Sequence, residues 1–263
     1  MKPFQYLHEV FSDKTAGEEI YRIEDAIGTI VVIARGDRRT LTLDSIYEQS
    51  SVLISEPQVL VHAYTQAMLL SLLFIKPDHV TLFGLGGGSL ALCLHRAFPQ
   101  LTIRAVEVRG SVIDVAYRYF YLPHSARLQV THAEVNDYLT SAPAGSTDII
   151  LSDLYHQYGM DSLQLKHDYI KRCYDLLSAE GWLVLNYHEL PTASSPVIQA
   201  IVALFVEVYQ CTVPSGNWIL LCGKSTMSTS RAVLTQRAKE LEQLIANPLT
   251  PHFKQLMRLK VSP

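Results

Sequence analysis

The segment Val80-Thr-Leu-Phe-Gly-Leu-Gly-Gly-Gly-Ser89 decides the fold expected for this chain. Its apolar first half runs into a loop that carries glycine at every second position, and a helix-like pattern begins directly afterwards. Glycine is required where the backbone takes positive φ values or approaches a ligand with no Cβ atom in the way. The three spaced glycines are Gly84, Gly86 and Gly88.

An acidic residue, Glu107, ends the next apolar run, about 20 residues after the loop. In nucleoside-binding α/β domains, a carboxylate at this distance accepts hydrogen bonds from the hydroxyl groups of a ribose. The loop lies between a strand and a helix, and the acid follows at the right spacing. Together these features predict a nucleoside-binding α/β domain.

The composition is that of an ordinary globular protein, because 48% of the 263 residues are hydrophobic and the formal net charge is −3. Without a basic excess, no nucleic-acid partner is expected. The N-terminal sequence lacks the apolar core of a secretory signal, and the most apolar stretch, 67–75, is too short to span a bilayer. We therefore expect a cytoplasmic protein with no membrane partner.

Cysteine and histidine spacing does not indicate a metal site. The four cysteines have no C-x-x-C spacing, so buried free thiols in a reducing compartment are expected. The ten histidines are scattered, and we expect His62 and His132 to be structural or surface residues. No metal cofactor is predicted.

The hydrophobic pattern divides the chain into two parts. Residues 20–45 read as short alternating strands, which predicts a small antiparallel β unit. Between residues 80 and 187 strand-like and helix-like runs alternate, which implies a mostly parallel sheet with helices on both faces. We place a small N-terminal β domain at residues 1–55 and a nucleoside-binding α/β domain at residues 56–263.

The last strands of the expected sheet form a hairpin. Runs 205–213 and 218–222 are joined by Pro214-Ser-Gly-Asn217, which leaves no room for a crossover helix. A hairpin that finishes an otherwise parallel sheet is typical of the Rossmann-like S-adenosylmethionine-dependent methyltransferase fold. That fold, with the small antiparallel β domain in front of it, is the fold class that we expect.

Several segments together resemble the spermidine synthase (polyamine aminopropyltransferase) family over roughly residues 20–224. Besides the glycine loop, they are Leu41-Thr-Leu-Asp-Ser-Ile-Tyr-Glu-Gln49, Tyr64-Thr-Gln66, Glu107-Val108, Glu134-Val135, Asp148-Ile-Ile-Leu-Ser-Asp153 and Val213-Pro-Ser-Gly-Asn-Trp218. Each segment alone is unspecific, and their order and spacing carry the resemblance.

The resemblance implies a transferase of polyamine biosynthesis, assembled as a homodimer. In this family an aminopropyl group moves from decarboxylated S-adenosylmethionine to an amine, and methylthioadenosine is released. The physical requirement is in-line displacement, in which an uncharged amine attacks the carbon next to the sulfonium and the enzyme accepts a proton. The sulfonium is already a good leaving group, so no metal is needed.

The resemblance also assigns roles to individual residues. The loop glycines pass beneath the nucleoside, and Glu107 binds the ribose hydroxyls. Asp153 deprotonates or orients the attacking amine, and Tyr64 lines the amine site. The remaining residues that the resemblance places at the nucleoside are Val108, Glu134, Val135 and, near the thioether end, Gln49.

The chain departs from the family pattern mainly on the amine side. The family loop has an aspartate that binds an ammonium group, and the matching residue here is Gly87. The second acid of the family's Asp-Ser-Ser-Asp-Pro is replaced by His156, and Gln66 stands where the family has glutamate. A dicationic amine needs carboxylates to hold its charges away from water. One such carboxylate, Asp153, remains, and the two that match Gly87 and His156 are lost.

Two further functions are compatible with the sequence. A methyltransferase that uses intact S-adenosylmethionine needs room for the carboxylate of that co-substrate, and Gly87 removes one source of repulsion there. A catalytically silent binding or scaffold protein would keep the fold without the amine-binding acids. An acid from a distant segment, such as Asp161 or Glu189, could also restore an amine site. The sequence does not identify the acceptor.

Overall fold

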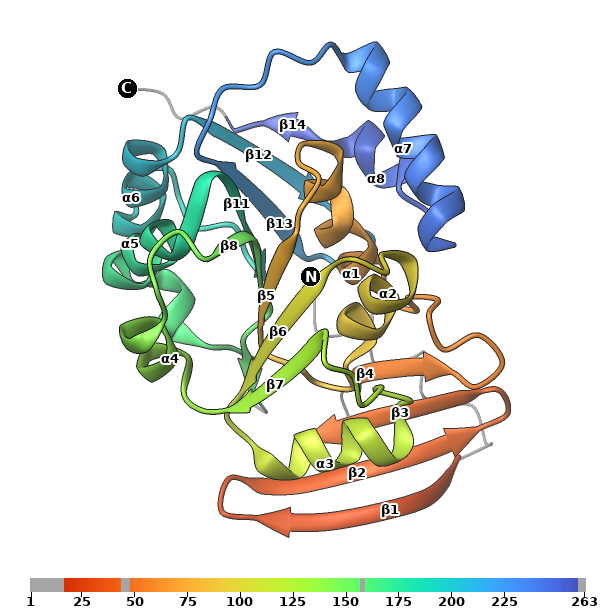
Figure 1. Ribbon diagram of the computed structural model, residues 1–263. Coiled ribbons are helices and arrows are strands. Elements are labelled where there is room, and N and C mark those ends of the chain that lie inside the picture. Colours follow the sequence, from red (N-terminus) through yellow and green to blue (C-terminus); the bar gives the residue numbers. More distant parts are fainter. Residues whose placement is uncertain (1–16, 44–47, 157–158, 260–263) are drawn as a thin grey trace, which may run out of the picture.

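The computed structural model describes residues 17–43, 48–156 and 159–259, apart from the side chain of His156. An antiparallel sheet comes first along the chain (Figure 1). Its order is β1-β2-β3-β4, so each strand pairs with its neighbour in sequence. The strands are β1 (Glu18–Asp25), β2 (Gly28–Arg35), β3 (Arg38–Leu43) and β4 (Glu48–Leu53). The sequence pattern predicted the first three; β4 is an addition, because its polar run Glu48-Gln-Ser-Ser51 gives no strand signal.

The second sheet has eight strands in the order β14-β12-β13-β11-β8-β5-β6-β7. Its central strands run parallel, and β12, β13 and β14 are antiparallel. This arrangement confirms the predicted fold class, with its hairpin at the end of a parallel sheet. The strands are β5 (His79–Phe83), β6 (Thr102–Glu107), β7 (Leu128–His132), β8 (Thr147–Ser152), β11 (Leu177–Tyr187), β12 (Glu207–Thr212), β13 (Trp218–Gly223) and β14 (Met257–Arg258).

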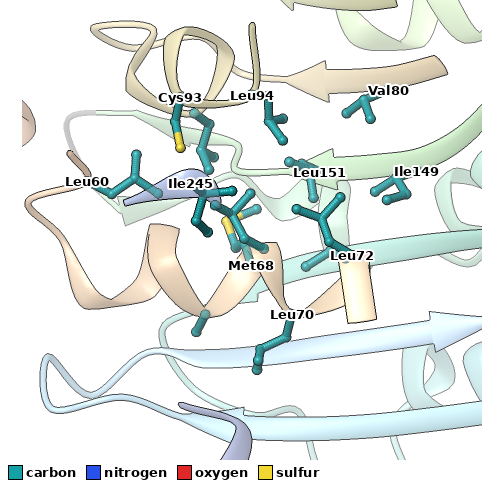
Figure 2. Packing of buried hydrophobic residues seen from close by; sticks show 14 of the residues in the cluster. Leu60, Met68, Leu70, Leu72, Val80, Cys93, Leu94, Ile149, Leu151 and Ile245 are labelled. Carbon is teal, nitrogen blue, oxygen red and sulfur yellow. The ribbon is translucent and has the colours of Figure 1, made fainter. Parts of the chain in front are cut away.

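Helices cover both faces of this sheet, as the alternating pattern predicts (Figure 1). On one face lie α1 (Ala63–Met68), the 3-10 helix η2 (Leu69–Leu73), α2 (Ser89–Ala97), α7 (Arg231–Ile245) and α8 (Thr250–Gln255). On the other lie α4 (Val135–Ser141), α5 (His167–Leu176) and α6 (Pro196–Leu204). Figure 2 shows the first interface, where Met68 and Leu72 pack toward Ile149 and Leu151 of the sheet and Ile245 of α7.

Helix α3 (Gly110–Tyr119) lies between the two sheets (Figure 1). Its residues Val112 and Val115 are buried in a separate cluster with Ile30 and Val32 of the N-terminal sheet. Burial of apolar area is the main stabilising contribution at such an interface. Because α3 directly follows β6, the N-terminal sheet is packed against the segment that follows Glu107.

Helix α6 was not predicted, because its residues are apolar on nearly every side and give no helical period. Its start has recognisable signals, since Pro196 occupies the first turn and the Ser195 side chain accepts a hydrogen bond from the Ile198 N–H. Among the described residues, no helix combines the length and apolar character that a bilayer crossing requires.

Candidate active site

The glycine loop follows β5 at the carboxyl end of the parallel strands. Gly84, Gly86 and Gly88 all have positive φ values, of 86°, 53° and 76°. The Gly84 N–H donates to Val106 O at 2.9 Å, and the Asp153 N–H donates to Phe83 O at 2.9 Å. The loop is thus fixed between the ends of β6 and β8. A Cβ atom on Gly84 would lie far inside van der Waals contact with the Asp153 carbonyl oxygen.

Gly84→Ala is expected to lower the free energy of unfolding by about 2–5 kcal/mol, because left-handed backbone strain and steric overlap with Asp153 add together. Gly36→Ala is the matched control. Gly36 also has positive φ, of 55°, but nothing lies within 4 Å of its Cβ position. In Gly36→Ala the free energy of unfolding should fall by about 1–2 kcal/mol, from backbone strain alone. Urea unfolding of both variants measures the difference, and equal losses would contradict the close approach at Gly84.

Glu107 is buried beneath the loop, with 9% of its surface exposed. One carboxylate oxygen, Oε2, accepts a hydrogen bond from the Leu85 N–H at 2.9 Å, and Oε1 accepts one from the Arg109 N–H at 3.0 Å. Each oxygen keeps further acceptor capacity, because an ionised carboxylate offers about four lone-pair positions. The acid is therefore held in one orientation and can still accept hydrogen bonds from a ligand.

The other predicted nucleoside residues lie at the same edge of the sheet. Val108 follows Glu107 and is 39% exposed. Glu134 is exposed at the N-terminus of α4, just after the adjacent strand β7, whereas Val135 is buried. Gln49 is on β4 next to Ser50, whose Cβ atom lies 3.6 Å from the Cβ position of Gly86. The N-terminal sheet therefore reaches the glycine loop.

Asp153 directly follows β8 and belongs to a polar cluster. Its Oδ1 accepts a hydrogen bond from Asn186 Nδ2 at 2.8 Å, and Tyr64 is a second hydrogen-bond partner. Asn186 is in turn held by Asn217 Nδ2 at 3.0 Å, from the turn between β12 and β13. Burial raises the pKa of Asp153, even though the hydrogen bonds from Asn186 and Tyr64 act in the opposite direction. Burial and the charge of Asp153 also raise the pKa of Tyr64.

A second buried network fixes the strand end beneath Asp153. The Ser152 hydroxyl donates to Gln164 Oε1 at 2.6 Å and is hydrogen-bonded to the Tyr169 hydroxyl at 2.6 Å. Gln164 belongs to the 3-10 helix η3 (Ser162–Leu165), and its Nε2 donates to Asn186 O at 3.3 Å. These contacts hold β8 and β11 in register at the point where Asp153 and Asn186 face each other.

Two residues that sequence reasoning did not place at the site lie close to Tyr64. The His62 ring stacks on the Tyr64 ring with centroids 5.5 Å apart, and His62 Nε2 lies 3.0 Å from Oε1 of Glu48 on β4. Arg38 also pairs with Glu48. Burial alone would raise the pKa of Glu48, but its contacts with His62, Ser51 and Arg38 outweigh burial and lower it to about 2. The only sequence signal was the position of Glu48 beside Gln49.

Further aromatic and imidazole groups lie on the other side of Asp153. Tyr155 follows it in the short hairpin β9 (Tyr155–His156) and β10 (Gly159–Met160), and its ring meets the exposed His188 ring edge-on with centroids 5.0 Å apart. Burial, and then the charge of Asp153, raise the pKa of Tyr155. The side chain of His156 lies outside the described residues.

Of the two acids that the sequence offered as replacements, Glu189 is exposed just after the end of β11. Asp161 caps η3 by accepting a hydrogen bond from the Leu163 N–H at 2.8 Å. Gln66 faces α8, where its Oε1 lies 3.0 Å from His252 Nε2. In the described part of the chain, no group of three or more potential ligands could hold a metal ion.

Gly87 packs tightly. A Cβ atom there would lie 2.7 Å from Phe120 Cδ1 and 2.8 Å from Ser50 Oγ. Both distances are shorter than real Cβ contacts, so an acidic side chain would require Phe120 and Ser50 to move. In this structure the space next to Gly87 is therefore filled by Phe120 and Ser50.

No family model matches the chain. The polyamine aminopropyltransferase of Chromobacterium violaceum is 31% identical over 230 residues, which cover 83% of this chain and 85% of that protein. The eEF1A lysine and N-terminal methyltransferase of Homo sapiens is 29% identical over 192 residues, which cover 67% of this chain and 27% of that protein.

Solved structures share the fold. A probable spermidine synthase from Corynebacterium glutamicum matches with a TM-score of 0.71 at 18% identity, over 87% of this chain and 86% of that one. A spermidine synthase in complex with the transition state analogue AdoDATO gives 0.62 at 18% identity, over 87% and 88%. Human methyltransferase-like protein 13 in complex with SAH gives 0.58 at 27% identity, over 70% and 90%.

The bacterial relative combines more than 30% identity with coverage of most of both chains. The chain belongs to the polyamine aminopropyltransferase (spermidine synthase) family, as a divergent member.

Proposed function

We propose that the protein transfers the aminopropyl group of decarboxylated S-adenosylmethionine to an amine acceptor in polyamine biosynthesis. The observation that carries this proposal is the meeting of two groups at one edge of the sheet. Glu107 lies beneath the glycine loop, and Asp153 lies against the first glycine of that loop. Membership of the family and the AdoDATO complex of a related fold support the same reaction.

The residues present fit an adenosyl group. Glu107 is preorganised by two backbone N–H groups and retains acceptor capacity for ribose hydroxyls. Val108 offers exposed apolar surface for the base, Val135 is buried, and Glu134 can accept a hydrogen bond from the adenine amino group. Gln49, on the strand that touches the loop, is assigned to the sulfur end.

Asp153 and Tyr64 are assigned to the acceptor. A sulfonium nucleoside bound at the loop supplies an electrophilic carbon attached to a good leaving group. The attacking amine must give up a proton, and Asp153 is suited to accept it because burial raises its pKa. Asn186 holds one carboxylate oxygen in place, and Tyr64 is a second hydrogen-bond partner of the carboxylate. The Tyr64 hydroxyl orients the Asp153 carboxyl group toward the amine.

Methyl transfer from intact S-adenosylmethionine is a second candidate, favoured by one observation. The space that an acid at Gly87 would need is filled by Phe120 and Ser50, so no loop carboxylate repels the carboxylate of an intact co-substrate. A human methyltransferase relative and the SAH complex of a similar fold support this alternative.

Calorimetry with three nucleosides distinguishes the candidates. We expect the purified chain to bind methylthioadenosine, and to bind decarboxylated S-adenosylmethionine at least about tenfold more tightly than the intact form, because the intact form adds a carboxylate close to Asp153. Preference for the intact form would instead support methyl transfer. Binding of none of the three would leave a catalytically silent relative and would contradict both enzyme functions.

We also propose that the active form is a cytoplasmic homodimer, in line with the family that the sequence resembles. Analytical ultracentrifugation of the purified chain tests the assembly, and a single monomeric species at assay concentration would contradict it.

A further inference from the structure

A continuous chain of hydrogen bonds joins the tip of the N-terminal sheet to the glycine loop. It begins at Asp25, the last residue of β1 before the turn to β2, and passes through Arg109 and Glu107 to Leu85. Asp25 and Arg109 are 84 residues apart in sequence, and Leu85 and Glu107 are 22 apart. The hydrogen bonds therefore connect the end of β1, the segment after β6 and the glycine loop directly.

In the outer half of this series of hydrogen bonds, the side chain of Arg109 pairs with Asp25. Arg109 Nη2 donates to Asp25 Oδ1 at 2.8 Å and Nε donates to Asp25 Oδ2 at 3.2 Å, so the pairing is bidentate. Nη2 also donates to Gly28 O at 2.8 Å. Only 6% of Arg109 is exposed, and the Ser111 hydroxyl supports the other side of Asp25. A planar guanidinium group with hydrogen bonds along two edges is held in one orientation, which restricts the Arg109 side chain and the backbone to which it is attached.

In the inner half of the series, the backbone of Arg109 makes the contact with Glu107. The Arg109 N–H donates to Glu107 Oε1 at 3.0 Å, while Glu107 Oε2 accepts from Leu85 in the glycine loop. Arg109 is also the residue that precedes the first turn of α3, and its backbone is extended. One residue thus binds Asp25 through its side chain and Glu107 through its backbone.

We propose that Asp25 and Arg109 are positioning residues for Glu107, and that the β1–β2 turn is in this way part of the nucleoside site. The part of this inference that concerns nucleoside affinity rests on the proposed function. The hydrogen-bond chain itself is independent of any ligand. The N-terminal sheet then contributes to both halves of the site, through Glu48 beside Tyr64 and through Asp25 behind Glu107.

We expect the glycine loop at Leu85 to become less firmly held when Arg109 or Asp25 is changed. Amide exchange and nucleoside affinity both measure this effect. Arg109→Met removes the guanidinium but keeps the backbone N–H, and Asp25→Asn removes the charge but keeps the shape. Both variants should speed amide hydrogen exchange at Leu85 by about tenfold or more, relative to the amide of Leu185 in the buried strand β11. Both should also weaken methylthioadenosine binding by about tenfold.

Glu19→Gln is the matched control, because Glu19 forms an exposed ion pair with Arg22 on the same strand as Asp25. It should change neither quantity by more than about twofold. Arg109→Lys should give an intermediate result, since an ammonium group cannot make the bidentate contact.

The ratio of the two exchange rates separates positioning from general stability. A purely structural role would speed exchange at Leu85 and Leu185 alike, and an unchanged ratio in both variants would overturn the inference. If the unaltered chain does not bind methylthioadenosine, the proposed function fails, while the exchange ratio still decides the role of Asp25 and Arg109. A changed ratio with unchanged affinity would remove the β1–β2 turn from the nucleoside site.

Discussion

Asp153→Asn is expected to lower turnover by about 10²–10⁴-fold, the usual contribution of a positioned proton acceptor. The amide cannot accept the proton of the attacking amine, yet it keeps the size of the carboxyl and can still bond to Asn186 and Tyr64. Affinity for methylthioadenosine should stay within a few fold, because Glu107 holds the nucleoside separately. Steady-state kinetics and calorimetry on the same preparation measure both quantities.

The same substitution is expected to stabilise the fold. The pKa of Asp153 is raised in the folded protein, so its ionised form is disfavoured there relative to the unfolded chain. Its favourable contribution is present below the unfolded pKa of about 3.9 and is lost as pH rises through the folded value. Near neutral pH, Asp153→Asn should therefore raise the melting temperature. By the same reasoning, activity should fall on acidification at a higher pH than an exposed aspartate would give.

Asp148→Asn is the control on the same strand. Asp148 accepts hydrogen bonds from the N–H groups of Asp78 and His79 and from the Ser178 hydroxyl, at the opposite end of β8 from Asp153. Its substitution should destabilise the protein by about 1–3 kcal/mol and leave turnover nearly unchanged. If Asp153→Asn behaves like Asp148→Asn, with lost stability and retained turnover, Asp153 is a structural residue and the proposed mechanism is wrong.

Glu107→Gln is expected to weaken methylthioadenosine binding by about 10²–10³-fold. Both carboxylate oxygens accept backbone N–H groups, so an amide must present its own donor to either Leu85 or Arg109. The substitution also removes the charge that would bind ribose hydroxyls, and hydrogen bonds to charged groups are the stronger ones.

Glu180→Gln serves as the control, because Glu180 is exposed in the part of β11 that lies away from the site. It should bind methylthioadenosine as the unaltered chain does. Calorimetry measures both variants, and full affinity in Glu107→Gln would remove Glu107 from the nucleoside site.

The sequence predicted the parts of the site that local patterns specify. The loop glycines and Glu107 follow from spacing, because a parallel sheet brings the carboxyl ends of its strands to one edge. The position of Asp153 after β8 followed in the same way. Helix α6 was missed, since its residues are apolar on nearly all sides and show no helical period.

Contacts between distant segments could not be predicted from the sequence. The pairing of Asp25 with Arg109 depends on how the N-terminal sheet packs on α3. The sequence shows that Gly87 lacks an acid, but only the packing shows that Phe120 and Ser50 occupy the space. His62, expected to be structural or at the surface, lies against Tyr64 because the segment before α1 reaches β4.

Product analysis by mass spectrometry shows which group the protein transfers and from which co-substrate. The purified chain is incubated with a panel of mono- and diamines and either decarboxylated or intact S-adenosylmethionine, with Asp153→Asn in parallel. We expect an amine that is heavier by one aminopropyl group, formed in equal amount with methylthioadenosine and only from the decarboxylated form, and nearly absent with the variant. A methylated product formed from the intact form, or aminopropyl transfer that is undiminished in Asp153→Asn, would contradict this expectation.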